Sequence, residues 1–206
     1  GDIESISKYL VKIGYGVQMM RYIEEYRKTG DLSILLYSLD LMNYEKMFDA
    51  LKFFRGDEGA VMRYFQARMD ERNVMILMKA FSLKMPFDLI RSGLLPYGTL
   101  KVQKLEEFFE QIKGGSDHVK MIEDLIGIQI ELQKEDQINL TVLEQKIQGS
   151  ILKKYIELLS TQANSLGSIF SVMLRTENER NNLRKIINGK VYGFEPSKIR
   201  ELLITV

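Results

Sequence analysis

The sequence contains two copies of a short polar motif, and their separation constrains the fold more than any other feature. The acid and the asparagine of Asp70-x-x-Asn73 return as Glu179-x-x-Asn182, 109 residues further along the chain, and an aliphatic residue follows each asparagine. This distance exceeds the period of the short solenoid repeats, which lies between about 20 and 50 residues. We therefore expect each copy to lie in a small helical bundle of its own.

Two further pairs of positions agree with this repetition. Leu39-Asp40 resembles Leu143-Glu144 at an offset of 104 residues, and Pro86 matches Pro196 at an offset of 110. The three anchors keep their order, and their offsets differ by no more than six residues. Chance similarity remains the alternative explanation, because amphipathic helices share the same apolar spacing.

Apolar residues recur at helical spacing along most of the chain, and signals for strands are nearly absent. The longest of these helical stretches run from about residue 58 to 83 and from about residue 166 to 188. We predict an all-α fold made of two similar helical-bundle repeats, one in residues 1–104 and the other in residues 105–206, related by a rotation.

Three local signals predict how particular helices continue, begin and end. Residues 126–132 alternate apolar and polar side chains as a strand would, but the wider window places the apolar residues on one helical face, so we expect a helix there. Thr141-Val142-Leu143-Glu144 has the spacing of a capping box, which predicts a helix start. Gly189 is expected to end the last long helix.

Charge and composition exclude several classes of protein. The chain has 29 Lys and Arg against 28 Asp and Glu, a formal net charge of +1, whereas nucleic-acid binding normally requires a basic excess. Because there is no cysteine, disulfide scaffolds, Cys-based zinc sites and thiol nucleophiles are excluded. The longest apolar run, Val74–Met78, is far shorter than the roughly 20 residues of a membrane span. These properties predict a soluble, intracellular protein.

The sequence offers little catalytic chemistry. His118 is the single histidine, so it cannot join a second histidine in a zinc site. Gly14-Tyr15-Gly16 lacks the remaining residues of a phosphate-binding loop. Glu106, Glu107 and Glu110 lie at helical spacing among lysines, as on a solvated face. We predict no catalytic residue, no metal, no cofactor and no small-molecule ligand; a helical enzyme is a disfavoured alternative.

The repeated motif has a simple physical meaning on a helix. Residues three apart share one face, so Asp70 with Asn73, and Glu179 with Asn182, can point together at a neighbouring element. Buried polar side chains mostly satisfy backbone groups. We therefore expect these four residues to bond the backbone of the following loop or to cap the next helix, in preference to binding a ligand.

The end of the chain resembles the C-terminal end of the C subunit of the V-type (archaeal-type) ATP synthase, the counterpart of the V-ATPase d subunit. The residues that carry the likeness are Glu179-Arg180-Asn181-Asn182-Leu183-Arg184-Lys185-Ile186, Gly189-Lys190, Gly193, Pro196 and Ile199-Arg200. The preceding part resembles the previous repeat of the same family through Thr29-Gly30-Asp31-Leu32, Leu39-Asp40, Asp70-x-x-Asn73 and Gly93-Leu94-Leu95-Pro96-Tyr97-Gly98.

The likeness has two departures from the family pattern. Family members have three related helical units, and only two fit this chain. Met75 also stands where the last copy has Arg184, which weakens any role assigned to that arginine.

The resemblance implies a mechanical function without catalysis. It implies a rotor component of a V-type or A-type ATP synthase, part of a funnel-like helical adaptor that passes torque between ion transport and ATP synthesis. The implied partners are the membrane rotor ring, made of proteolipid subunits, and the D and F subunits of the central stalk. The implied location is cytoplasmic, peripheral on the cytoplasmic face of the membrane. Arg91, Arg184 and Lys190 are expected to pair with carboxylates of the stalk.

A helical scaffold or regulatory module outside the rotary machinery is the alternative to this interpretation. It would have the same composition and the same lack of catalytic chemistry. The spatial equivalence of the two motifs discriminates between the two hypotheses, because a rotor component built from family repeats should place both motifs alike.

Overall fold

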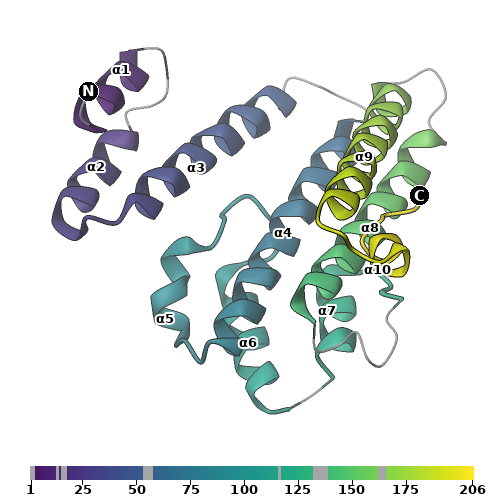
Figure 1. Ribbon diagram of the computed structural model, residues 1–206. Helices are drawn as coiled ribbons and strands as arrows, with labels where there is room; N and C mark the ends of the chain where they lie inside the picture. Colours follow the sequence, from purple (N-terminus) through teal and green to yellow (C-terminus); the bar gives the residue numbers. More distant parts are fainter. Residues whose placement is uncertain are drawn as a thin grey trace. The chain divides into compact units, whose positions relative to one another are not determined.

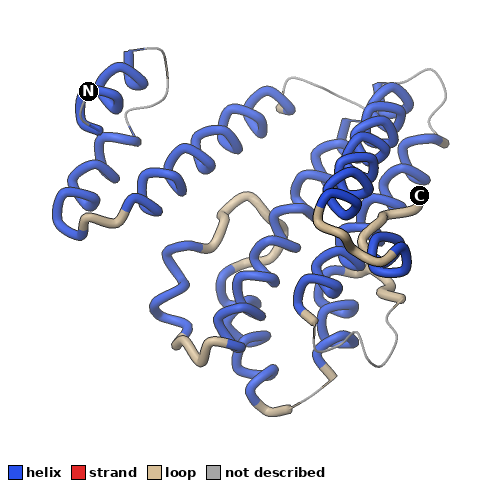
Figure 2. Tube along the Cα trace, in the orientation of Figure 1, coloured by secondary structure: helices blue, strands red, loops and turns tan. Residues whose placement is uncertain are grey.

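The computed structural model describes residues 3–12, 14, 18–52, 58–115, 117–131, 139–161 and 166–206. Within these ranges the regular structure is entirely helical, which confirms the predicted all-α class (Figure 2). No helix of the described part is long and apolar enough to cross a membrane. The elements are α1 (Ile3–Lys12), α2 (Gln18–Thr29), α3 (Leu32–Leu51), α4 (Glu58–Ser82), α5 (Phe87–Ile90), the 3-10 helix η1 (Arg91–Gly93), α6 (Val102–Lys113), α7 (His118–Ile126), α8 (Leu140–Ser160), α9 (Leu166–Val191) and α10 (Pro196–Glu201).

The chain forms two compact units, Gly1–Phe54 and Arg55–Val206. The predicted division into repeats at residues 104 and 105 concerns sequence similarity between segments, whereas these units are defined by packing. That division stays a prediction.

The first unit contains α1, α2 and α3 around a small apolar core of Ile23, Leu35 and Met42. The helix α2 ends at Thr29, and Gly30 follows with a positive φ of 71°, a conformation that glycine adopts without steric cost. The carboxylate of Asp31 then accepts a hydrogen bond from the Ser33 N–H and caps α3.

The second unit is organised around α4, which packs against α8 and α6 (Figure 1). Its core includes fully buried residues of α6, α7 and α8, among them Phe109, Ile122 and Ile147. Side-chain contacts show that α4 and α8 are antiparallel, because residues with increasing numbers in α4 contact residues with decreasing numbers in α8. These contacts are Tyr64 with Tyr155, Glu71 with Gln148 and Lys79 with Glu144.

The helix predicted for residues 126–132 is wrong at residues 127–131, and residue 132 lies outside the described residues. The helix α7 ends at Ile126, and Gly127 has the left-handed φ of 69°. After this turn the Ile130 N–H donates a hydrogen bond of 2.6 Å to the Glu123 carboxylate, and Ile128 and Ile130 are buried. The alternation of side chains therefore reflects a non-helical segment with one buried side, up to residue 131 where the described range ends.

The predicted capping box at Thr141 is also wrong. The helix α8 begins earlier, and Asn139 is its N-cap, with a side-chain oxygen that accepts hydrogen bonds from the N–H groups of Thr141 and Val142. Thr141 cannot begin a capping box because it is the second residue of α8, and Glu144 forms an ion pair of 3.1 Å with Lys79 of α4.

The predicted helix end at Gly189 is wrong by a few residues, since α9 continues to Val191 and Gly193 supplies the left-handed φ of 68°. Gly189 has a packing role instead. A Cβ at this position would lie 2.6 Å from Cγ1 of Ile199, so the absent side chain lets α10 approach α9.

Candidate protein-interaction surface

Asn73 is fully buried on α4 and is bonded to the backbone of the loop that follows η1. Its Nδ2 donates to the Leu95 carbonyl at 2.9 Å, and its Oδ1 accepts from the Leu95 N–H at 2.7 Å. One side chain thus satisfies both backbone groups of a buried residue, which holds the loop against α4.

Asn182 makes the same pair of bonds on α9. Its Nδ2 donates to the Ile204 carbonyl at 2.7 Å, and its Oδ1 accepts from the Ile204 N–H at 3.1 Å. In both copies the bonded residue lies 22 positions after the asparagine. The two asparagines therefore make equivalent backbone bonds, each between a long helix and the segment that returns to it.

The two acids of the motif are not equivalent. Asp70 is buried, and its carboxylate accepts hydrogen bonds from the N–H and hydroxyl of Thr99 and from the N–H of Leu100. Glu179 is exposed. The buried polar position beside it belongs to Asn178, whose side chain donates to the Ile204 carbonyl at 2.8 Å.

Glu71 is a buried charged residue that no sequence motif indicated. Its side chain is 1% exposed, with one oxygen 2.8 Å from Nη1 of Arg68 and the other accepting a hydrogen bond from Gln148 of α8. Burial is the main influence on this group and raises the pKa of Glu71, while the charge of Arg68 and the Gln148 bond act in the opposite direction. No signal in the sequence could have distinguished it, because Glu71 stands in a row of charged residues.

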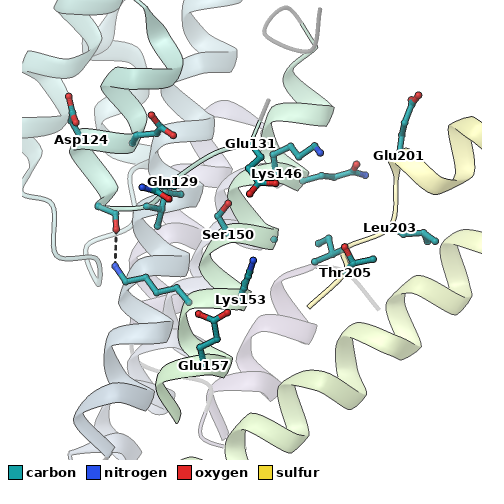
Figure 3. Close-up of a pocket in the computed structure, with 17 residues that line it drawn as sticks. Asp124, Gln129, Glu131, Lys146, Ser150, Lys153, Glu157, Glu201, Leu203 and Thr205 are labelled. Carbon is teal, nitrogen blue, oxygen red and sulfur yellow. Dashed lines mark hydrogen bonds between the residues drawn. The ribbon is translucent and has the colours of Figure 1, made fainter. Parts of the chain in front are cut away.

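A groove of about 930 Å³ opens between the end of α7, the outer side of α8 and the C-terminal segment (Figure 3). Its lining carries acidic residues such as Asp124, Glu157 and Glu201 beside the lysines Lys146 and Lys153. Within the described residues no group of histidine or acidic side chains could hold a metal ion.

The three cations predicted to contact a partner lie on two elements. Arg91 is exposed in η1, whereas Arg184 and Lys190 are exposed on α9.

The single histidine, His118, is half-buried in the first turn of α7, with its ring against Phe81 and Nε2 3.2 Å from the Ile112 carbonyl.

These features define an all-α protein in which two long helices, α4 and α9, each bond a returning segment through side chains that include the repeated asparagine. Comparison with known proteins identifies the family. Residues 1–202 match the sequence model of the ATP synthase (C/AC39) subunit family, and the chain belongs to this family.

Curated relatives agree with this assignment. The chain is similar to the C subunit of the A-type ATP synthase of Thermoplasma acidophilum, with 36% identity over 206 residues, and to that of Thermoplasma volcanium, with 34% identity over 209 residues. The alignments cover 99% and 98% of this chain and 57% of each relative. The corresponding protein of Desulfurococcus sp. is 26% identical over 188 residues, which are 88% of this chain and half of that protein. No solved structure matches the chain.

Proposed function

We propose that this chain is a part of the C subunit of an A-type ATP synthase and acts as a non-catalytic element between the membrane rotor ring and the central stalk. Its membership of the ATP synthase (C/AC39) subunit family across residues 1–202 is the observation that carries the proposal. The relatives to which it is similar in sequence are named as the C subunits of A-type ATP synthases. The proposed location is accordingly peripheral, on the cytoplasmic face of the membrane.

A part that transmits torque must resist bending, and two properties of this chain support such a role. The helices α4 and α9 are 25 and 26 residues long, and α8 lies against both. The asparagine bonds fix the segments that return to α4 and α9 at the backbone groups of Leu95 and Ile204. Densely packed interiors have low compressibility and transmit strain.

Binding to isolated partners tests the proposal. The probes are a detergent-solubilised proteolipid ring and a complex of the D and F subunits of the central stalk from the same organism, and saturable binding of the full-length protein to both is expected. Absence of binding to either would contradict the rotor assignment in favour of a scaffold outside the rotary machinery.

Charge reversal tests the proposed contact residues. The variant Arg91→Glu/Arg184→Glu/Lys190→Glu should bind the stalk complex at least about tenfold more weakly, because like charges repel across an interface. Single alanine changes should cost only about 0–1 kcal/mol each, since exposed ion pairs are weak. The control reverses three other exposed cations, Lys101, Lys104 and Lys120. Equal binding by the two triple variants would reassign the three proposed contacts to solvated surface.

The non-catalytic part of the proposal has its own test. Titration calorimetry with ATP and Mg²⁺ should detect no saturable binding to the isolated protein, and a phosphate-release assay should detect no turnover. Saturable ATP binding would contradict this part of the proposal and leave the family assignment intact.

A further inference from the structure

We propose that one face of α9 binds an amphipathic helix of another protein chain, antiparallel to α9, with an apolar stripe flanked by carboxylates. The inference goes beyond the proposed function, because it assigns a helix face, the chemistry of a partner segment and its direction, whichever complex contains the chain. It rests on a difference in burial between this face of α9 and the corresponding face of α4, which the internal repeat relates to each other.

The face in question is apolar and exposed, and we call it the outer face of α9. Its residues lie three or four positions apart, which places them on one side of the helix, and the apolar ones are between 47% and 76% exposed. Soluble proteins rarely leave so long an apolar stripe uncovered unless it binds something. The outer face consists of Leu166, Ile169, Val172, Met173, Leu183, Ile187 and Val191, with Arg180, Arg184 and Lys190 among them.

The corresponding face of α4 is covered. At the offset of 109 residues that relates Asn73 to Asn182, Leu183 corresponds to Val74 and Ile187 to Met78. Val74 and Met78 are 0% and 3% exposed, whereas Leu183 and Ile187 are 59% and 60% exposed. The same helix face is therefore buried in one copy and open in the other.

The helix α8 shows what kind of element such a face accepts. Along α4, Tyr64 contacts the ring of Tyr155 with centroids 5.7 Å apart, and Glu71 accepts a hydrogen bond of 3.0 Å from Gln148. Because the two contacts pair increasing with decreasing residue numbers, the covering helix is antiparallel to α4. By the same offset Tyr64 corresponds to Met173, on the outer face of α9.

Charge distinguishes the partner of α9 from α8. Glu71 of α4 is replaced by Arg180 on α9, and Met75 is replaced by Arg184. A helix that covers the outer face must therefore present acceptors to two guanidinium groups, and carboxylates match their geometry best. Arg180 lies 3.4 Å from Glu177, but both side chains are 60% exposed, so this pair is weak and allows the guanidinium to bind a second carboxylate.

A second copy of the chain is a poor occupant of this face. Each copy of the outer face carries Arg180, Arg184 and Lys190, so two outer faces packed together would place cations of both copies in one interface, and like charges across an interface are unfavourable. The charges of the face therefore favour a different chain with acidic residues beside its apolar stripe.

Photo-crosslinking in cells that naturally make the protein tests the inference. Benzoylphenylalanine is placed at Ile187 or Met173 of the full-length protein, the cells are irradiated before lysis, and the crosslinked peptides are mapped by mass spectrometry. The control position is Arg175, which is exposed on α9 outside the outer face. We expect crosslinks from Ile187 and Met173, and few from Arg175, to one helical segment of another chain that contains Asp or Glu beside an apolar stripe.

The two positions also test the direction. In an antiparallel partner, Ile187 should crosslink to residues earlier in the partner sequence than those reached from Met173. The two crosslinked sites should lie about 14 residues apart in the partner helix, because both helices have the same rise per residue. The reverse order would overturn the proposed orientation. Crosslinks to any other part of the same polypeptide, including residues 1–54, to a second copy, to lipid or to no protein would overturn the proposal itself.

Charge reversal provides the second measurement. Arg180→Glu/Arg184→Glu should reduce the crosslink yield from Ile187 at least about tenfold, while the matched reversal of Lys104 and Lys120 should leave it unchanged. Circular dichroism of each variant checks that the helices are retained. An unchanged yield in a folded Arg180→Glu/Arg184→Glu variant would overturn the acidic character of the partner. Because Arg184 is also a proposed stalk contact, binding of the same variant to the complex of the D and F subunits is measured beside the crosslink yield. Weakened stalk binding with an unchanged yield would overturn this inference alone, and a reduced yield with unchanged stalk binding would support it apart from the proposed function.

Discussion

Lys84 and Gly193 occupy the same backbone position at the ends of α4 and α9, with positive φ angles of 56° and 68°. The N–H of Lys84 donates to the Phe81 carbonyl, and the N–H of the next residue reaches back to Ala80. The same two bonds recur 109 residues later around Gly193. The two helices therefore end in the same turn, although only one of them has the glycine that such a turn favours.

This relationship predicts that Lys84→Gly raises the free energy of unfolding by about 0.5–1 kcal/mol. The side chain of lysine makes the left-handed conformation unfavourable, and the relief of that strain exceeds the added freedom of glycine in the unfolded chain. Urea denaturation followed by circular dichroism measures the change. The reciprocal variant Gly193→Lys should lower the free energy of unfolding by a similar amount, and a loss of stability in Lys84→Gly would contradict the argument.

Replacing either repeated asparagine should destabilise the fold. Asn73→Leu leaves the N–H and carbonyl of Leu95 without these bonds, and Asn182→Leu removes the bond to the Ile204 N–H while Asn178 still donates to the Ile204 carbonyl. Each change should lower the free energy of unfolding by about 1–3 kcal/mol. The loss should be larger for Asn73, because Asn182 is only partly buried. Asn181→Leu, at the exposed neighbouring position, is the control for thermal denaturation. A melting temperature as high as that of the control would show that water replaces the lost bonds.

Gly189→Ala should lower the free energy of unfolding by about 1–3 kcal/mol. The new methyl group would overlap Ile199 of α10, so either the side chain or the short helix must move. Gly93→Ala is the control, because nothing lies within 4 Å of a Cβ there. Adding Ile199→Ala to Gly189→Ala should cost less than the two single changes together, and strict additivity in urea denaturation would argue against the overlap.

The buried Glu71 should make stability depend on pH. Since burial raises its pKa above the ordinary value of 4.5, the folded protein holds this proton at pH values where the unfolded chain has released it. The free energy of unfolding should therefore fall as the pH rises from about 4.5 through the raised pKa, and this contribution should be constant at higher pH. Arg68, Arg72 and Gln148 reduce the effect, and Glu144 adds to it.

Glu71→Gln isolates this dependence. The amide keeps a polar group beside Gln148 but has no charge to desolvate, so the stability of the variant relative to the native protein should increase as the pH rises from 4.5 to 7. Urea denaturation of both proteins at several pH values gives this difference. A difference that stays constant or decreases with pH would show that the ion pair with Arg68 outweighs burial.

Much of the fold was predictable from the sequence, because helices depend on local spacing. The apolar periodicity predicted the extents of α4 and α9 to within a few residues. The repeated asparagines at positions 73 and 182 were recognisable as a pair, and both bond a returning segment. The errors at residues 127–131 and at Thr141 arose where a side chain outside the expected pattern accepts hydrogen bonds from the backbone. Glu123 accepts from the Ile130 N–H, and Asn139 accepts from the N–H groups of Thr141 and Val142.

The sequence by itself determined the helical class and the equivalence of the two asparagines, since both follow from residue type and spacing along one helix. Only the tertiary structure decided which equivalent residues are buried. Met78 and Ile187 are both apolar and correspond to each other, yet α4 is surrounded by other helices while the outer face of α9 is open. Burial depends on what packs against a helix from distant parts of the chain, and the residues of the helix do not encode that neighbour.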